Sequence, residues 1–354
     1  MNTNSASSLN VFKIASAYIG TVVGAGFASG QEILQFFGAF GAAGLFGVII
    51  SSVLFFFIGY SILILGRHLK ATSHVDIVRY TNGPFFGSFI DIIITIFMFG
   101  GLAAMIAGAG AIFDEQFSIS PIWGTLAMAV ITLLTVVTGT KGVINAISYV
   151  VPFLILSVLV ISIGSLINNP ITHEEVRMAS RLNGATPNWL LSAVNYASYN
   201  IVISIGVLTP MGAVTHDKSK LFWGALLGAV GLGIGMIAIY FCLLTNIADV
   251  YAMQVPMIEI ANKLSVVIRV VFAVVLFAEV YTTAVGNLYG FVQRLSVKLP
   301  KIYFIIGATL LAFMAGQLGF SNMVKYLYPV VGYGGIFFFV GVVWTWLRKR
   351  NALR

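Results

Sequence analysis

The sequence predicts an all-α membrane protein with ten transmembrane helices, arranged as two inverted five-helix repeats in which the first and sixth helices are broken. Three observations predict this fold. Apolar residues make up 59% of the chain and charged residues only 8%, with a mean hydropathy of +1.00, whereas about 25% of the residues of a soluble domain are charged. The apolar residues gather into ten long runs. The first and sixth of these runs carry interruptions at matching positions.

Ten spans of about 20 residues each nearly exhaust a chain of 354 residues, so we expect a single transmembrane domain over residues 1–354. The first ten residues are rich in Ser and Asn. They lack the basic start and the cleavage site of a signal peptide, and we expect them to remain as a tail. Repeat one is predicted at 11–168 and repeat two at 189–347. The predicted spans are 11–39, 43–66, 86–112, 122–140, 143–167, 189–213, 221–247, 265–291, 301–319 and 326–347.

Basic residues are distributed unevenly between the two ends of the predicted spans. If the N-terminus is cytoplasmic, 14 of the 19 basic residues fall in cytoplasmic segments, which follows the positive-inside bias of membrane proteins. This pattern accounts for the net charge of +8 without nucleic acid as a partner. We therefore expect a multi-pass protein of the cell membrane, surrounded by the lipid bilayer, with both termini in the cytoplasm. The oligomeric state stays open. The outer basic residues are Arg177, Arg181, Lys263, Arg269 and Lys325.

Signals of enzyme chemistry are absent from the sequence. Cys242 is the only cysteine, which excludes an intrachain disulfide and a cysteine metal cluster. The four histidines are scattered over predicted loops, and the chain has no paired-aspartate motif, nucleophile elbow or phosphate loop. We therefore predict that the protein is not an enzyme and has no cofactor apart from a coupling ion.

Three acidic residues lie in or near the predicted spans, namely Glu32, Asp91 and Glu279. A charged side chain deep in a bilayer costs at least about 2.5 kcal/mol on insertion scales, so such residues usually face the bundle interior or water. Glu32 follows Gly24 by eight residues, which places it about 12 Å further along a helix that rises 1.5 Å per residue. We expect Glu32 at the outer vestibule, where a role as a gate competes with simple solubility.

Glycines interrupt the first span. Gly20, Gly24, Gly26 and Gly30 fall within eleven residues, and each costs roughly 1 kcal/mol relative to alanine inside a helix. A break near Gly24 would expose backbone groups at membrane depth, which is tolerated where they line a cavity. The amides after the break would face an anion, and the carbonyls before it would face a cation. The alternative is an unbroken helix that packs closely through its small residues.

Polar residues lie at the matching position of the sixth span. Broken helices in transporters come in pairs at corresponding positions of two inverted halves, so the sixth span should mirror the first. Ser198, Tyr199, Asn200 and Ser204 lie at about the depth of Gly24 in this mirror segment. The coincidence favours a substrate pocket between two breaks over helix packing alone.

The eighth span carries a polar face. Glu279, Thr282, Thr283 and Gly286 follow one another at i, i+3, i+4 and i+7, and they therefore share one side of a helix. A carboxylate and two hydroxyls suit a hard cation, which takes oxygen ligands. The alternative for the threonines is that their hydroxyls bond to carbonyls of the preceding turn.

Two further patterns concern packing and loop structure. Apolar residues recur at helical spacing within Ala248–Lys263, which predicts a short helix across the outer mouth, with an ordered loop as the alternative. The seventh span contains two pairs of glycines four residues apart, which predicts close helix packing. These glycines are Gly224, Gly228, Gly231 and Gly235.

The first span also resembles a known family. The run Gly20-Thr21-Val22-Val23-Gly24-Ala25-Gly26-Phe27, followed by Gly30-Gln31-Glu32, is similar to the start of the YkvI-type amino-acid permeases. That family belongs to the amino acid/polyamine/organocation transporter superfamily. The resemblance covers the ten-span layout of the whole chain and implies a leucine-transporter-like fold.

The resemblance implies roles for particular residues. A sodium position would be surrounded by the carbonyls of Gly20 and Val23 and the side chains of Glu279, Thr282 and Thr283. A substrate carboxylate would be held by the amides of Gly24, Ala25 and Gly26, with Tyr199 and Asn200 completing the pocket. Some proton-coupled relatives carry a lysine in the fifth span, where this sequence has Ser148, Tyr149 and Pro152.

Together these features predict a cation-coupled symporter that takes up a small carboxylate-bearing solute, such as an amino acid, by alternating access. The coupling ion is Na⁺ or H⁺, and the lack of a fifth-span lysine favours Na⁺. One alternative is a non-transporting sensor or receptor on the same fold. Another is a metal-ion transporter, which would be expected to have Asp-Pro-Gly at the break in the first span, where this sequence has Gly24-Ala25-Gly26.

Overall fold

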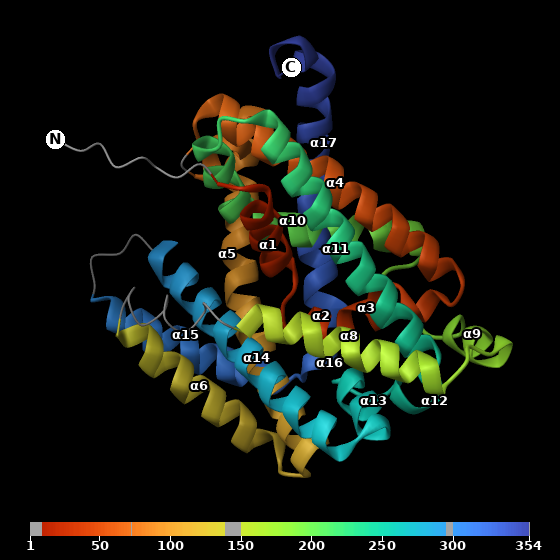
Figure 1. Ribbon diagram of the computed structural model, residues 1–354. Coiled ribbons are helices and arrows are strands. Elements are labelled where there is room, and N and C mark those ends of the chain that lie inside the picture. Colours follow the sequence, from red (N-terminus) through yellow and green to blue (C-terminus); the bar gives the residue numbers. More distant parts are fainter. Residues whose placement is uncertain (1–8, 72, 139–149, 295–299, 354) are drawn as a thin grey trace.

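The protein is helical throughout the described residues of a computed structural model, which are 9–71, 73–138, 150–294 and 300–353 (Figure 1). Six stretches of this part of the chain are long and apolar enough to cross a membrane. Five of them are α4 (Ala43–Leu69), α5 (His74–Phe117), α10 (Trp189–Val214), α11 (Lys218–Leu244) and α14 (Val266–Arg294). The sixth runs through α16 (Phe320–Asn322), the π-helical η2 (Met323–Leu327) and α17 (Tyr328–Leu353).

Four shorter apolar helices complete the set of predicted spans. They are α1 (Val11–Val22), α6 (Pro121–Val137), α8 (Val150–Asn168) and α15 (Lys301–Gly316). Each predicted apolar run therefore overlaps a long or a shorter apolar helix, while the count of membrane crossings and the inverted repeat stay predictions. Parts of several predictions lie outside the described residues: the start of the N-terminal tail, the junction of the fourth and fifth spans with Ser148 and Tyr149, and Arg354.

The helix α5 starts before the predicted third span and bends on the way. Its first turn is closed by Ser73, whose hydroxyl accepts from Val75 N, and by the Asp76 carboxylate, which accepts from Ser73 N. Gly83 then adopts φ 77°, and Pro84 follows it. The positive φ is available to glycine at low cost, and proline cannot donate to the previous turn. The predicted third span begins just beyond this kink.

The sixth span is not broken, which corrects the prediction for this helix. α10 is a single helix from Trp189 to Val214. The side chains that suggested a break bond to their own helix instead: Asn200 Nδ2 donates to the Tyr196 carbonyl at 3.0 Å, and Ser204 Oγ donates to the Asn200 carbonyl at 2.8 Å. The span also contains only two glycines, Gly206 and Gly212, whereas four glycines of the first span fall within eleven residues. Polar residues that can bond back to their helix therefore do not require a break.

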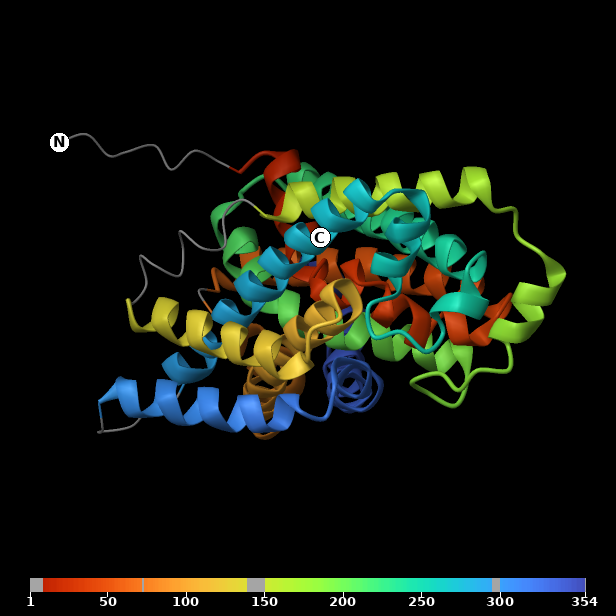
Figure 2. The ribbon, with the colours of Figure 1, turned by 90° about the horizontal axis from the view of Figure 1, so that it is seen from below.

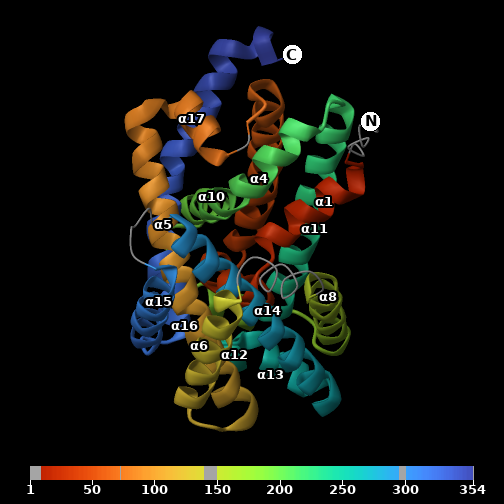
Figure 3. The ribbon, with the colours of Figure 1, turned by 90° about the vertical axis from the view of Figure 1, so that its left-hand side faces the viewer.

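Two groups of helices pack against one another. One contains α1, α4, α10 and α11, and the other contains α5, α6, α14 and α15. α17 packs on both α10 and α5, and α8 packs on α11 and α14. Figure 2 shows α6 and α15 together on one side of the molecule, with α17 seen along its axis. In Figures 1 and 3 the start of α1 and the end of α17 lie at the same end.

The glycines of α11 pack as predicted. A methyl group on Gly228 would lie 2.7 Å from the Tyr18 ring, and one on Gly224 would lie 2.5 Å from Ile14. Both contacts belong to α1, so the small residues let α1 lie directly on α11. This packing fixes the helix that ends at the break in the first span.

Short helices connect the longer ones. α9 (His173–Ala179), α12 (Ile247–Val250) and α13 (Pro256–Leu264) lie at the end of the molecule away from the C-terminus (Figure 1), which is the end predicted to face outward. α3 (Gln31–Phe36) and the 3₁₀-helix η1 (Gly38–Phe40) follow the break in the first span. The predicted short helix within Ala248–Lys263 corresponds to α13, which starts with Pro256 in its first turn. Hydrogen bonds hold the start of α13 and the residues before it against other parts of the chain. Glu115 Oε1 and Oε2 accept from the amides of Gln254 and Val255 at 2.6 and 2.9 Å, and Met257 N donates to the Ser29 carbonyl at 3.0 Å.

Candidate substrate and ion site

The first span breaks where its glycines predicted. α1 ends at Val22, Gly24 is extended with φ −122° and ψ −170°, and the four-residue α2 (Ala25–Ala28) follows. Among the described residues, the amides of Gly24, Ala25 and Gly26 donate to no carbonyl or side chain. Unpaired backbone groups at this depth require a polar cavity in front of them.

A second turn brings Glu32 back to the break. Gly30 adopts the left-handed conformation with φ 80°, and α3 starts immediately after it. The chain therefore does not continue as the straight helix that would carry Glu32 about 12 Å away. Glu32 is only 5% exposed, its Oε2 accepts a hydrogen bond from the Tyr199 hydroxyl, and its carboxylate lies directly against Gly26. The predicted position in an outer vestibule is wrong, because the glycine turn folds the side chain inward.

A central cavity of about 100 Å³ lies in front of the break. One water takes up about 10–15 Å³ by such a measure, so the space suits several waters or a small solute. Ten of the twelve predicted site residues line it: Gly20, Val23, Gly24, Ala25, Gly26, Glu32, Tyr199, Asn200, Glu279 and Thr283. The tertiary fold thus brings the first, sixth and eighth spans to one space.

Two predicted site residues do not line this cavity. Ser198 is fully buried on the side of α10 that faces α17, where a methyl group on Gly335 would lie 2.9 Å from the Ser198 carbonyl. Thr282 Oγ1 donates to the Glu279 carbonyl at 3.0 Å, which is the bond to the preceding turn considered as its alternative. Each lies one position away from a residue that does line the cavity, and one step along a helix turns a side chain by about 100°.

The lining face of α14 is a stripe of residues four positions apart. Thr283 Oγ1 donates to Glu279 Oε1 at 3.3 Å, while Glu279 Oε2 is buried and has no hydrogen-bond partner among the described residues. Asn287 extends the stripe by one more turn, and its amide lies close to Gly101 of α5. The stripe is therefore Glu279, Thr283 and Asn287. Its four-residue spacing is visible in the sequence and could have identified Asn287.

Aromatic residues form the opposite part of the lining. Tyr199 was predicted here from the sequence, whereas no sequence signal pointed to Phe97 or Tyr328. Phe97, Tyr199 and Tyr328 come from α5, α10 and α17, and their rings pack on one another. An aromatic residue inside an apolar run predicts burial and not a particular neighbour. Only the packing of the helices shows that these rings face the same space as Glu32.

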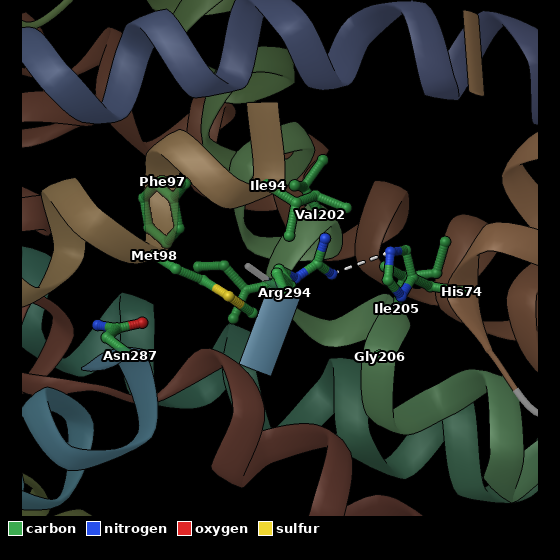
Figure 4. Close-up of a pocket in the computed structure, with 10 residues that line it drawn as sticks. His74, Ile94, Phe97, Met98, Val202, Ile205, Gly206, Asn287 and Arg294 are labelled. Carbon is green, nitrogen blue, oxygen red and sulfur yellow. Dashed lines mark hydrogen bonds between the residues drawn. The ribbon is translucent and has the colours of Figure 1, made fainter. Parts of the chain in front are cut away.

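A second cavity of about 70 Å³ continues from the first toward the predicted inner end (Figure 4). The two cavities share Phe97, Ile203 and Asn287. Figure 4 shows Arg294 beside His74, with Arg294 Nη2 3.0 Å from His74 Nε2. Arg294 also forms an ion pair with Asp91, whose carboxylate lies 3.2 Å from His74 Nε2.

His74, Asp91 and Arg294 form a charged cluster beside the second cavity, which His74 and Arg294 line. His74 is the first residue of α5 and Arg294 is the last residue of α14, so the cluster connects the start of α5 to the end of α14. Asp91 is thereby placed at an ion pair and not in the central cavity. Apart from His74, Asn287 and Arg294, the second cavity is lined by apolar side chains and Gly206.

Two relatives from Bacillus subtilis (strain 168) extend over most of the chain, while no protein-family model matches it. The membrane protein YkvI is 30% identical over 343 residues, which cover 96% of this chain and 97% of YkvI. The protein YyaD is 25% identical over 318 residues, which cover 89% of this chain and 90% of YyaD.

Similar solved structures include MhsT in complex with L-phenylalanine, with a TM-score of 0.64 and 16% identity over 92% of this chain and 87% of MhsT. The inward-facing conformation of Mhp1 has a TM-score of 0.63 at 11% identity over 99% of this chain and 81% of Mhp1. A Na⁺-coupled sialic acid symporter has a TM-score of 0.57 at 13% identity over 98% of this chain and 75% of that chain. These likenesses show a leucine-transporter-like fold, and the extended similarity to YkvI shows that the chain belongs to the YkvI family of multi-pass membrane proteins.

Proposed function

We propose that the protein is a secondary active transporter that carries a small solute, such as an amino acid, together with a cation by alternating access. The observation that carries this proposal is the central cavity, in which an unpaired carboxylate oxygen of Glu279 and the open backbone of a helix break face the same buried space. Proteins of this fold include a symporter described as Na⁺-coupled and MhsT, which binds L-phenylalanine. In this proposal ten helices cross the cell membrane as inverted repeats, with both termini in the cytoplasm.

The proposed ion position lies between the end of α1 and α14. The carbonyls of Gly20 and Val23 precede the break, and Glu279 and Thr283 line the cavity with them. A methyl group on Gly24 would lie 4.0 Å from Thr283 Oγ1, so the break and the hydroxyl are close neighbours. Carboxylate, hydroxyl and carbonyl oxygens are ligands for a hard cation. We propose Na⁺ as the coupling ion.

The proposed solute position lies on the other side of the break. The free amides of Gly24, Ala25 and Gly26 face it, and Tyr199 and Asn200 of α10 line it. Glu32 closes this space toward the covered outer end, with its hydrogen bond from Tyr199 linking α3 to α10. In this arrangement Glu32 acts both as a wall of the site and as a gate.

Proteoliposomes test the function directly. With the purified full-length protein and an inward Na⁺ gradient, we expect labelled solute from a mixture of amino acids and amines to accumulate above the level set by equilibration. Protein-free liposomes and a matched K⁺ gradient are the controls. If neither a Na⁺ gradient nor a proton gradient drives accumulation of any of these solutes, transport is the wrong function.

Neighbouring threonines provide a matched test of the ion position. Thr283→Val removes a hydroxyl that lines the cavity, whereas Thr282→Val removes one that bonds back to the Glu279 carbonyl. We expect Thr283→Val to weaken ²²Na⁺ binding to purified protein about fivefold. This corresponds to a loss of about 1 kcal/mol of binding free energy, which is typical for the removal of one hydrogen-bonding group. Thr282→Val should bind ²²Na⁺ like the wild type. The reverse order would place the ion elsewhere on α14.

The charged cluster at the inner end is expected to hold that end closed. Asp91→Asn removes the charge that pairs with Arg294 and should free the arginine from the cavity mouth. The readout is a Gly206→Cys probe in a Cys242→Ala background, because a side chain at Gly206 meets no atom within 4 Å and the position lines the second cavity. We expect a membrane-impermeant maleimide to label the probe several-fold faster in Asp91→Asn. Equal labelling rates would show that the cluster does not close this end; Glu174→Gln, an exposed acid on α9, is the control.

A further inference from the structure

The charge balance of the central cavity restricts what can fill it. Two carboxylates, Glu32 and Glu279, line the cavity, and none of the described residues that line it is Lys, Arg or His. The nearby Arg294 belongs to the second cavity and is already paired with Asp91. A buried carboxylate needs a counter-charge or a proton, because the desolvation of an unpaired charge costs several kcal/mol. A cation at Glu279 would balance only one of the two.

Glu32 also occupies the place that a substrate carboxylate would use. Its carboxylate lies so close to Gly26 that a methyl group on Gly26 would overlap it. A carboxylate that belongs to the protein therefore already lies beside Gly26, just after the break. A second carboxylate from a solute would meet Glu32 at short range, where like charges repel strongly in a medium of low dielectric constant.

The rings around Glu32 suit a cation. Phe97 and Tyr328 have their centroids 5.6 Å apart, Tyr199 and Tyr328 5.2 Å apart, and Phe97 and Tyr199 6.3 Å apart, and all three rings line the cavity. An ammonium group is attracted to the faces of aromatic rings within about 6 Å of their centroids, and more strongly where water is excluded. Tyr199 donates its hydroxyl to Glu32, which orients the carboxylate beside this group of rings.

We propose that the solute is bound by its positively charged ammonium group, which pairs with Glu32 and contacts the rings of Phe97, Tyr199 and Tyr328, and that a carboxylate on the solute is dispensable. This inference rests on the proposed function and narrows its substrate class to amines, of which amino acids are one kind. Glu32 then supplies the negative charge at the helix break, and Glu279 remains free for the coupling ion.

Matched sets of ligands test this assignment with the purified full-length protein. Each set shares one side chain: alanine, ethylamine and propionate; leucine, 3-methylbutylamine and 4-methylpentanoate; phenylalanine, 2-phenylethylamine and 3-phenylpropionate. Binding is measured by thermal shift in Na⁺ buffer, since a ligand that binds the native state raises its apparent stability. In at least one set we expect the amine to bind within about fivefold of the amino acid, and the acid to bind more than about 30-fold more weakly, the range of a desolvated charge pair.

Variants identify the group that binds the ammonium. Glu32→Gln keeps an oxygen for the Tyr199 hydroxyl but removes the charge, so amine affinity should fall about tenfold or more. Phe97→Leu should lower it about threefold through the lost ring face. Glu259→Gln, which changes an acid on α13 outside the cavity lining, should leave it unchanged.

Three outcomes would overturn the assignment: stabilisation by the acids without the amines, no stabilisation by any amine, or unchanged amine affinity in Glu32→Gln. Its failure is distinguishable from failure of the proposed function. Ion-driven uptake of acids but not amines would support the transporter function and contradict the ammonium site. Amine binding that depends on Glu32, without uptake in proteoliposomes under Na⁺ or proton gradients, would support the ammonium site and contradict the transporter function.

Discussion

Gly26→Val is expected to abolish solute binding and uptake while the protein still inserts into the membrane. Gly26 is the second residue of α2, just after the break in the first span, and even a methyl group there would overlap the Glu32 carboxylate. Valine adds three carbons, so the Glu32 side chain must leave its place beside Tyr199 or α2 must move away from α3. Either change fills or distorts a cavity of about 100 Å³. Binding of the leucine and 3-methylbutylamine pair by thermal shift measures the loss.

A glycine outside the site controls for the general cost of adding a side chain. A methyl group on Gly307 of α15 would meet no atom within 4 Å, so Gly307→Val should bind both ligands normally. Elution of each variant as a single species in size-exclusion chromatography verifies folding. A well-folded Gly26→Val protein with wild-type affinity would mean that the glycine serves helix packing and that the solute lies elsewhere.

Glu279→Gln is expected to lower the apparent affinity for Na⁺ by at least about tenfold, which corresponds to about 1.4 kcal/mol. Glu279 is 4% exposed, and its Oε2 has no hydrogen-bond partner among the described residues. The substitution keeps the shape and the contact with Thr283, but it removes the formal charge of the proposed ion position. The loss should therefore exceed the loss in Thr283→Val, where only a neutral ligand is removed.

The dependence of uptake on Na⁺ concentration measures this effect, with Glu174→Gln, an exposed acid on α9, as the charge-matched control. A different coupling ion would give a different pattern. If uptake proceeds equally in Na⁺ and K⁺ buffers but stops when the proton gradient is dissipated, the sodium position is wrong and Glu279 becomes the leading proton carrier. Normal uptake and normal Na⁺ dependence in Glu279→Gln would leave the residue with a structural role only.

The break in the first span could be predicted from the sequence because its cause is local. Clustered glycines make a continuous helix costly wherever the segment lies, and the structure has the break at Gly24 as expected. The close packing of α11 could be predicted for a similar reason, since small residues at a four-residue interval leave a flat helix surface whatever lies opposite. Its partner, α1, is known only from the structure. The spacing of Glu279 and Thr283 placed both on one face in the same way.

The same reasoning failed where one sequence pattern is compatible with two sets of hydrogen bonds. The polar residues of α10 suggested a break, yet Asn200 and Ser204 bond to their own helix. The hydroxyls of Thr282 and Thr283 looked equivalent, and only their side-chain bonds separate them. In each case a side chain can bond either within its helix or across a cavity, and the choice depends on neighbours that are remote in sequence.

By itself the sequence determined a helical membrane protein, the break at Gly24 and the inward position of Glu279, because bilayer insertion and helix propensity act on each segment separately. The tertiary structure decided which residues share the cavity. The left-handed turn at Gly30 folds Glu32 back onto Gly26, and the packing of α5, α10 and α17 brings Phe97, Tyr199 and Tyr328 around it. Contacts between distant segments arise only when whole helices pack, and their register is not encoded in any one segment.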